Sequence, residues 1–205
     1  MLNQLLSQLT QRASTALVCN QYQDPDRLKN VGIYFDYLLT NKPGLMLVGE
    51  APGYLGCRLT GIPFTSEDVI QTSEHPFFKK NHGLFKLHGT TSERTATMLW
   101  SILGPNRPLP LLWNAFPFHP HRANEPKSNR KPTSEEMQEG EHFIRCLYSM
   151  FGASKVYAIG RVSQQCLSKV FPQTAIGYIR HPSYGGKREF LNGMRGAFQS
   201  ALAGG

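Results

Sequence analysis

Apolar positions along the chain recur with two periods, one typical of helices and one of buried strands. Four leucines between Leu2 and Leu9 have helical spacing and predict an amphipathic N-terminal helix. Asp24-Pro25 is typical of an N-cap followed by a first-turn proline, and predicts a second helix that ends at Pro43-Gly44. The apolar run Leu45–Val48 then predicts a fully buried strand.

The same alternation continues toward the C-terminus. Three more strands are predicted, over 111–116, 156–160 and 175–179. Further helices are predicted from Thr91 to Gly104, from Ser134, from Val162 to Phe171 and from about Lys187. Strands that alternate with helices favour a mostly parallel sheet with helices on both faces, so the sequence predicts an α/β fold.

Polar residues follow several of these strands. Glu50 comes just after the first strand, Asn114 lies within or at the end of the second, and His181 follows the fourth. Taken singly, Glu50 and His181 have an ordinary explanation as turn or surface residues, and the Asn114 amide as a group bonded to the backbone. In parallel sheets, however, ligands bind beyond the carboxyl ends of the strands, so together they predict a site at that edge.

These segments, in this order, resemble the uracil-DNA glycosylase superfamily. Gly49-Glu50-Ala51-Pro52-Gly53 is similar to the first motif of its bacterial and archaeal branch. Phe64, Asn114 and His181-Pro182-Ser183 match the remaining signature positions, and the resemblance spans about residues 45–190. It implies one three-layer α/β/α domain over residues 1–205, with a four-stranded sheet, that extrudes a nucleotide from DNA and cleaves its base–deoxyribose bond.

The resemblance also implies a role for each site residue. Phe64 would stack on the extruded base, and Asn114 would bind its polar edge. His181 would donate a hydrogen bond to the pyrimidine oxygen that becomes negative as the bond breaks, and Glu50 would orient or deprotonate the attacking water. The implied substrate-binding residues are Gly49, Ala51, Pro52, Gly53, Phe64, Asn114 and Ser183.

Two positions depart from the best-studied branch. That branch has an aspartate where this chain has Ala51, which leaves water activation to Glu50. It has a bulky aromatic where this chain has Gly53, which leaves room for a 5-substituent unless Tyr54 closes the gap. Three functions therefore remain open: excision of uracil, excision of a bulkier 5-substituted pyrimidine such as a hypermodified viral base in antiviral defence, and DNA binding without catalysis.

The chain carries a formal net charge of +8, which favours binding to a polyanionic partner such as a nucleic acid. Two basic loops, 75–88 and 117–132, are predicted to clamp DNA. The first interleaves its charges with Phe77, Phe78 and Phe85, as in proteins that bind opened or single strands. Tyr184 or Arg188 is predicted to wedge into the gap left by the base. The predicted DNA contacts are Lys79, Lys80, Lys86, His121, Arg122, Lys127, Arg130, Lys131, Tyr184, Lys187 and Arg188.

Cysteine usage and hydropathy set further expectations. The four cysteines are scattered and form no C-x-x-C pair, so we expect reduced thiols and neither an iron–sulfur cluster, a metal nor another cofactor. A cluster assembled across the fold from all four is the alternative. No apolar run approaches the roughly 20 residues of a membrane helix, and the N-terminus lacks signal-peptide features. These features favour a cytoplasmic monomer.

Overall fold

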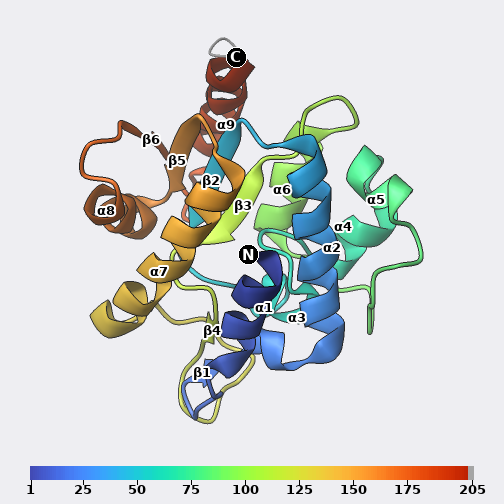
Figure 1. Ribbon diagram of the computed structural model, residues 1–205, viewed down its shortest axis with the longest axis vertical. Helices are drawn as coiled ribbons and strands as arrows, with labels where there is room; N and C mark the ends of the chain where they lie inside the picture. Colours follow the sequence, from blue (N-terminus) through green and yellow to red (C-terminus); the bar gives the residue numbers. More distant parts are fainter. Residues whose placement is uncertain (203–205) are drawn as a thin grey trace.

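The structure is a computed structural model that describes residues 1–202, so the last three residues of the predicted 1–205 domain lie outside it (Figure 1). Its elements in chain order are α1 (Leu2–Gln11), β1 (Val18–Cys19), the 3₁₀ turn η1 (Gln21–Gln23), α2 (Pro25–Asn41), β2 (Leu45–Gly49), α3 (Cys57–Thr60), α4 (Glu67–Thr72), α5 (Pro76–Lys80), α6 (Arg94–Leu103), β3 (Leu111–Asn114), β4 (His119–Pro120), α7 (Ser134–Phe151), β5 (Lys155–Ile159), α8 (Arg161–Val170), β6 (Ile176–Ile179) and α9 (Lys187–Leu202).

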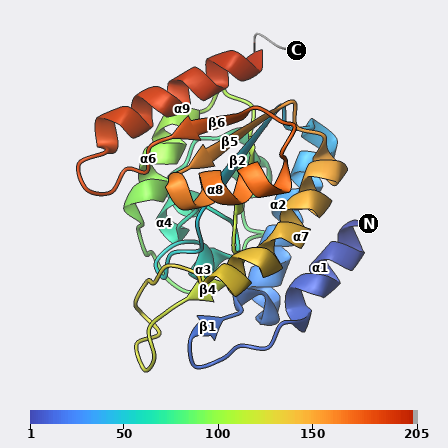
Figure 2. The ribbon, with the colours of Figure 1, turned by 90° about the vertical axis from the view of Figure 1, so that its left-hand side faces the viewer.

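A four-stranded sheet in the order β3-β2-β5-β6 forms the centre of the molecule. Every neighbouring pair is parallel, and Gly49 at the end of β2 lies beside Asn114 at the end of β3. Helices α7 and α8 pack on one face and α6 and α9 on the other, and Figure 2 shows β6 between α8 and α9. All five residues of β2 are buried because both faces of the sheet are covered. The predicted three-layer α/β/α architecture is confirmed.

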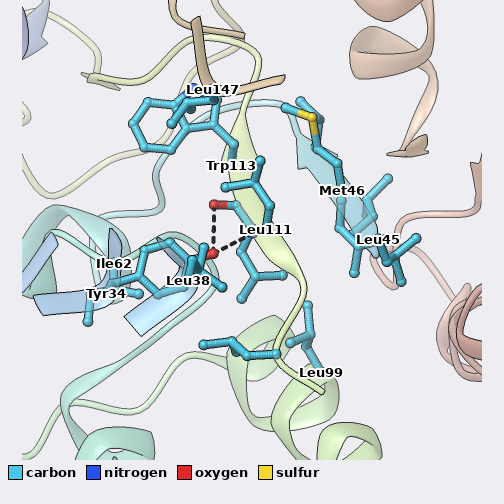
Figure 3. Packing of buried hydrophobic residues seen from close by; sticks show 14 of the residues in the cluster. Tyr34, Leu38, Leu45, Met46, Ile62, Leu99, Leu111, Trp113 and Leu147 are labelled. Carbon is cyan, nitrogen blue, oxygen red and sulfur yellow. Dashed lines mark hydrogen bonds between the residues drawn. The ribbon is translucent and has the colours of Figure 1, made fainter. Parts of the chain in front are cut away.

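The free edge of β3 is covered by α2. The hydroxyl of Tyr34 on α2 donates to the carbonyl oxygen of Leu112 over 3.3 Å and accepts from the Leu112 backbone N–H (Figure 3). It also lies 3.1 Å from the carbonyl oxygen of Pro110. An edge strand otherwise leaves such groups unpaired, and Tyr34 is itself fully buried. One tyrosine therefore satisfies the outward-facing backbone at the middle of this strand.

The short elements were not predicted, and two expectations about exposure are wrong. Phe77 and Phe78 on α5 are buried in the core, where they pack around Trp100, so they are not available to stack on DNA bases. His121 is also buried, because β1 and β4 pair as an antiparallel ribbon within the segment that reads as a polar loop. Aromatic and histidine side chains can pack in a hydrophobic core as well as contact DNA, and here they pack in the core.

None of the helices within residues 1–202 is both long enough and apolar enough to cross a membrane.

Candidate active site

A cavity of about 930 Å³ lies at the carboxyl edge of the sheet. Loops that follow β2, β3, β5 and β6 form its walls, together with the start of α6. It contains every residue that the sequence singled out for catalysis or base binding. These lining residues are Gly49, Glu50, Ala51, Pro52, Gly53, Phe64, Asn114, His181 and Ser183.

Gly49 is the point at which two of these side chains meet. A Cβ atom added to Gly49 would lie 2.3 Å from Cζ of Phe64 and 3.0 Å from Oδ1 of Asn114. No real Cβ atom approaches a ring carbon so closely, so only glycine permits the phenyl ring and the amide to sit together over the end of β2. The ring and the amide thus form the floor of the cavity.

Phe64 is held in an unusual backbone conformation. Its φ is +53°, in the left-handed region that costs a non-glycine residue roughly 1–3 kcal/mol. The indole Nε1–H of Trp100 donates to the Phe64 carbonyl oxygen over 3.0 Å and to the Thr65 hydroxyl over 3.2 Å. The buried indole therefore fixes the turn that presents the Phe64 ring to the cavity.

Asn114 is 4 % exposed, yet it lines the cavity. Its side-chain amide makes no hydrogen bond with any residue in the described part of the chain. The amide atoms themselves are not fully enclosed, so a ligand in the cavity can bind them. Since an amide both donates and accepts, Asn114 is suited to the polar edge of a base.

His181 presents a defined hydrogen-bond donor. Its Nδ1 accepts from the Ser183 hydroxyl (2.8 Å) and from the Ser183 backbone N–H (3.3 Å). Because the backbone N–H can only donate, Nδ1 is unprotonated and the neutral ring carries its proton on Nε2. His181 is exposed at the cavity surface, and partial loss of hydration there lowers its pKa, which favours this neutral form.

Glu50 lies in the same cavity, half-buried. Loss of hydration raises the pKa of its carboxyl group, and the nearby positive charge of Lys131 opposes that shift. A carboxylate that is partly desolvated is a stronger base than one in water. Glu50 is therefore poised to take a proton from a water molecule in the cavity.

Two hydrogen bonds from the 117–132 segment hold the first-motif loop. Nδ1 of His119 donates to the carbonyl oxygen of Pro52 over 2.8 Å, and the Tyr54 backbone N–H donates to Oδ1 of Asn129 over 3.1 Å. Gly53 lies between these contacts, and a Cβ atom added there would have no neighbour within 4 Å. The loop is thus fixed on both sides of a position that faces open space.

Of the predicted DNA contacts, only Arg130, Lys131 and Tyr184 line the cavity. Arg130 is committed to structure, because it pairs with Glu136 (2.7 Å) and donates to three backbone carbonyls. Tyr184 is 99 % exposed and has a φ of +52°, at the tip of the loop between β6 and α9. Figure 2 shows this loop projecting at the left. The buried ring of His121 stacks on His119, so the prediction that His121 contacts DNA is wrong.

The remaining predicted DNA contacts are exposed and lie outside the cavity. Lys79 and Lys80 are on α5, which Figure 1 places on the opposite side of the molecule from α8 and β6, and Lys79 pairs with Glu74. Arg122 pairs with Glu125 over 2.7 Å. For these positions, contact with DNA stays a prediction. The others in this group are Lys86, Lys127, Lys187 and Arg188.

Sequence reasoning missed several residues that line the cavity. Arg161 begins α8 just after β5, and Arg180 directly precedes His181, so the rule that sites form beyond strand ends could have found both. Arg94, the first residue of α6, and Tyr178, near the end of β6, also belong to the walls. Other missed lining residues are Leu55, Cys57, Ser92, Glu93, Thr95, Asn129, Ile159 and Gly160.

Metal-ligating side chains gather at one place in the part of the chain that the structure describes, where Asp24, Asp26 and His88 approach one another. Asp24 is already used there, because its carboxylate caps α2 and pairs with Arg27. The four cysteines do not join a metal-binding group within residues 1–202.

Comparison with known proteins points to one family. Residues 35–199 match the uracil DNA glycosylase superfamily. No curated protein matches the chain. Among solved structures, the chain is similar to the crystal structure of wild-type Pedobacter heparinus SMUG2, with a TM-score of 0.65 and 17 % sequence identity. That similarity covers 100 % of this chain and 98 % of the other, and at such identity it shows a shared fold.

Proposed function

The chain belongs to the uracil DNA glycosylase superfamily, and from this premise we propose that it hydrolyses the N-glycosidic bond of an extruded uracil or related pyrimidine in DNA. One observation carries the proposal. The Phe64 ring, the unbonded Asn114 amide and the Nε2–H donor of His181 belong to a single cavity at the sheet edge. An aromatic face, a two-way hydrogen-bonding group and a fixed donor are what a flipped pyrimidine requires.

Some of the cavity residues bind the base, and others act in cleavage of the glycosidic bond. The base stacks on Phe64 while the Asn114 amide pairs with its polar edge. As the bond to the sugar breaks, its electron pair passes to the base, and the Nε2–H of His181 stabilises the negative charge on the pyrimidine oxygen. Water adds to the sugar carbon and transfers a proton to the Glu50 carboxylate, whose charge also favours the oxocarbenium-like sugar. The reaction is that of base excision repair.

Gly53 favours a second candidate substrate, a pyrimidine with a bulky 5-substituent. The space beside Gly53 is open for at least 4 Å around the position that a Cβ atom would take. Such a substrate occurs in hypermodified viral DNA, which would give the enzyme a role in antiviral defence. The third candidate, a DNA-binding relative without catalysis, has in its favour only Ala51, at the position where the best-studied branch has an aspartate.

An assay of base release separates the three candidates. Single- and double-stranded oligonucleotides carrying uracil, 5-hydroxymethyluracil or glucosylated 5-hydroxymethylcytosine are incubated with the wild type and with His181→Ala. We expect uracil release by the wild type and at most a trace by the variant. Release of only the larger bases would favour the second candidate, and binding without any release the third.

DNA is the proposed partner, bound by a cytoplasmic monomer, and Tyr184 is the proposed wedge. Its side chain is completely exposed and its backbone is left-handed, so the aromatic ring contributes nothing to the stability of the fold. A ring in this position is suited to insertion between bases, which favours Tyr184 over Arg188 as the wedge.

Exposed lysines and arginines would contact phosphates, so affinity for non-target DNA should fall with salt at a log–log slope steeper than about −2. A flatter slope would exclude the predicted clamps as backbone contacts.

A further inference from the structure

Four residues that line the cavity are not used by the proposed chemistry. They are Gly160 and Arg161 at the start of α8, and Tyr178 and Arg180 on and after β6. A Cβ atom added to Gly160 would lie 3.6 Å from Cβ of His181, so this part of the cavity wall adjoins the histidine directly. It is therefore placed to contact what is covalently attached to the extruded nucleotide.

Arg161 and Tyr178 form a stacked pair in the wall of the cavity. The guanidinium carbon of Arg161 lies 5.6 Å from the centroid of the Tyr178 ring, in a cation–π arrangement, and Tyr178 is 40 % exposed. Arg161 makes no ion pair and no side-chain hydrogen bond with the described residues. An exposed tyrosine on an edge strand under an unpaired arginine, inside a concave surface, is suited to a flat anionic ligand.

Arg180 adds a second positive charge, held in place on one side. Its guanidinium donates to the Tyr184 carbonyl oxygen over 3.3 Å and lies 4.0 Å from the Glu189 carboxylate. These contacts are long and partly exposed, so they orient the guanidinium without neutralising it. Proteins that bind single-stranded nucleic acid combine stacking aromatics with such cations.

We propose that Arg161, Tyr178 and Arg180 form a subsite for the nucleotide next to the extruded one in the same DNA strand. The neighbouring base stacks on the Tyr178–Arg161 pair, and Arg180 contacts the phosphate between the two nucleotides. This inference rests on the proposed function. A base that stacks here has left its own stack, so the subsite favours a single strand or an opened duplex.

Binding measurements test the subsite without turnover. Fluorescence anisotropy is used with single-stranded oligonucleotides that carry the target base, and with copies in which one neighbouring nucleotide is replaced by an abasic tetrahydrofuran. We expect Tyr178→Ala to weaken binding of the intact strand about tenfold, since stacking on an aromatic contributes roughly 1–3 kcal/mol per base. Tyr178→Phe, which keeps the ring, should bind within about twofold of the wild type.

The abasic strands complete a double-mutant cycle. Removing the base on one side should weaken wild-type binding about tenfold and Tyr178→Ala binding by less than about twofold. Arg161→Gln should weaken binding severalfold, whereas Arg195→Gln, an exposed arginine on α9 outside the cavity, should not. Equal effects of base removal in wild type and Tyr178→Ala, or no measurable binding at all, would overturn the subsite.

The outcome for the subsite is separable from that for the glycosylase. If base removal weakens wild-type binding more than Tyr178→Ala binding, but the protein releases no base, the subsite is supported and the proposed reaction is excluded. If the protein releases the base, but base removal weakens binding equally in wild type and Tyr178→Ala, only the subsite is excluded.

Discussion

Nδ1 of His119 donates a hydrogen bond to the carbonyl oxygen of Pro52 over 2.8 Å, although the histidine is fully buried. Because a carbonyl oxygen can only accept, the neutral ring carries its proton on Nδ1. Burial lowers the pKa of His119, and the positive charge of Arg58 adds to that effect. A buried neutral histidine thus anchors the loop that carries Glu50.

Replacing His119 by Leu should therefore impair catalysis from outside the cavity. The Pro52 carbonyl would lose its donor at a cost of roughly 1–3 kcal/mol, and we expect a fall of about tenfold or more in single-turnover base release. His119→Asn, whose amide nitrogen can take the place of Nδ1, should restore much of the rate. Thermal unfolding of both variants provides the control. Equal rates in the two variants would show that the hydrogen bond does not position the loop.

Gly49→Ala should disrupt the floor of the cavity. The new Cβ atom would overlap the Phe64 ring and press on the Asn114 amide, so one or both must move. Overpacking of this kind costs roughly 1–3 kcal/mol, and we expect base release to fall by at least about tenfold. Gly53→Ala is the matched control, because its Cβ atom would enter open space. If both variants keep the wild-type rate, Phe64 and Asn114 do not act together on the base.

His181→Ala should lower single-turnover base release by roughly 10²–10³-fold while leaving DNA affinity nearly intact. Its Nε2–H acts on charge that develops only as the bond breaks, so binding of the intact substrate loses little. Ser183→Ala should have a smaller effect, because it loosens the ring without removing the donor. The single-turnover rate of base release is measured by chemical quench, and the affinity for DNA is measured separately by fluorescence anisotropy. Equal losses in both would make His181 a binding residue only.

The Glu50 carboxyl group should set the acid limb of the pH–rate profile. The ionised form accepts the proton, so the rate should fall as pH decreases through a pKa raised above that of an ordinary glutamate. Lys131 opposes that rise, so Lys131→Gln should move the limb to higher pH. Glu50→Gln should lower the rate and abolish the limb. A limb that stays in place in Lys131→Gln would point to another group as the base.

Gly53→Tyr should narrow the range of substrates. A ring at this position would fill the open space beside the base and exclude 5-substituents, while uracil should still fit. Steric exclusion of this kind can exceed the roughly 1–3 kcal/mol gained from one methylene. The ratio of uracil release to 5-hydroxymethyluracil release should therefore rise. Equal losses on both substrates would assign Gly53 to the turn, and a wild type that rejects every 5-substituted base would make Tyr54 the gate.

Most of the fold and the centre of the site could be predicted from the sequence. Strands such as β2 are continuous apolar runs, and helices such as α2 begin at recognisable caps, since Asp24 accepts from the backbone N–H of Asp26 and Arg27. Once the strands are parallel, Glu50 and Asn114 must lie at the same edge. The family motifs then added Phe64, which no period or cap would have singled out.

Burial of polar side chains could not be predicted in the same way. His119 and His121 stand in a polar segment that reads as exposed, and only the pairing of β1 with β4 places them inside. Local sequence does not report such a contact between distant segments. The contact of Tyr178 with Arg161 was missed for a similar reason, because it depends on the order of β5 and β6 in the sheet.

Tyr34 has a consequence beyond the stability of β3. An edge strand with unpaired backbone groups can recruit a strand from a second copy of the chain, and such pairing can propagate into insoluble aggregates. Because one phenol hydroxyl engages both the N–H and the carbonyl of Leu112, the strand offers an incoming chain neither group at its midpoint. Loss of that hydroxyl would therefore expose a template for intermolecular β-pairing, and its cost would grow with protein concentration.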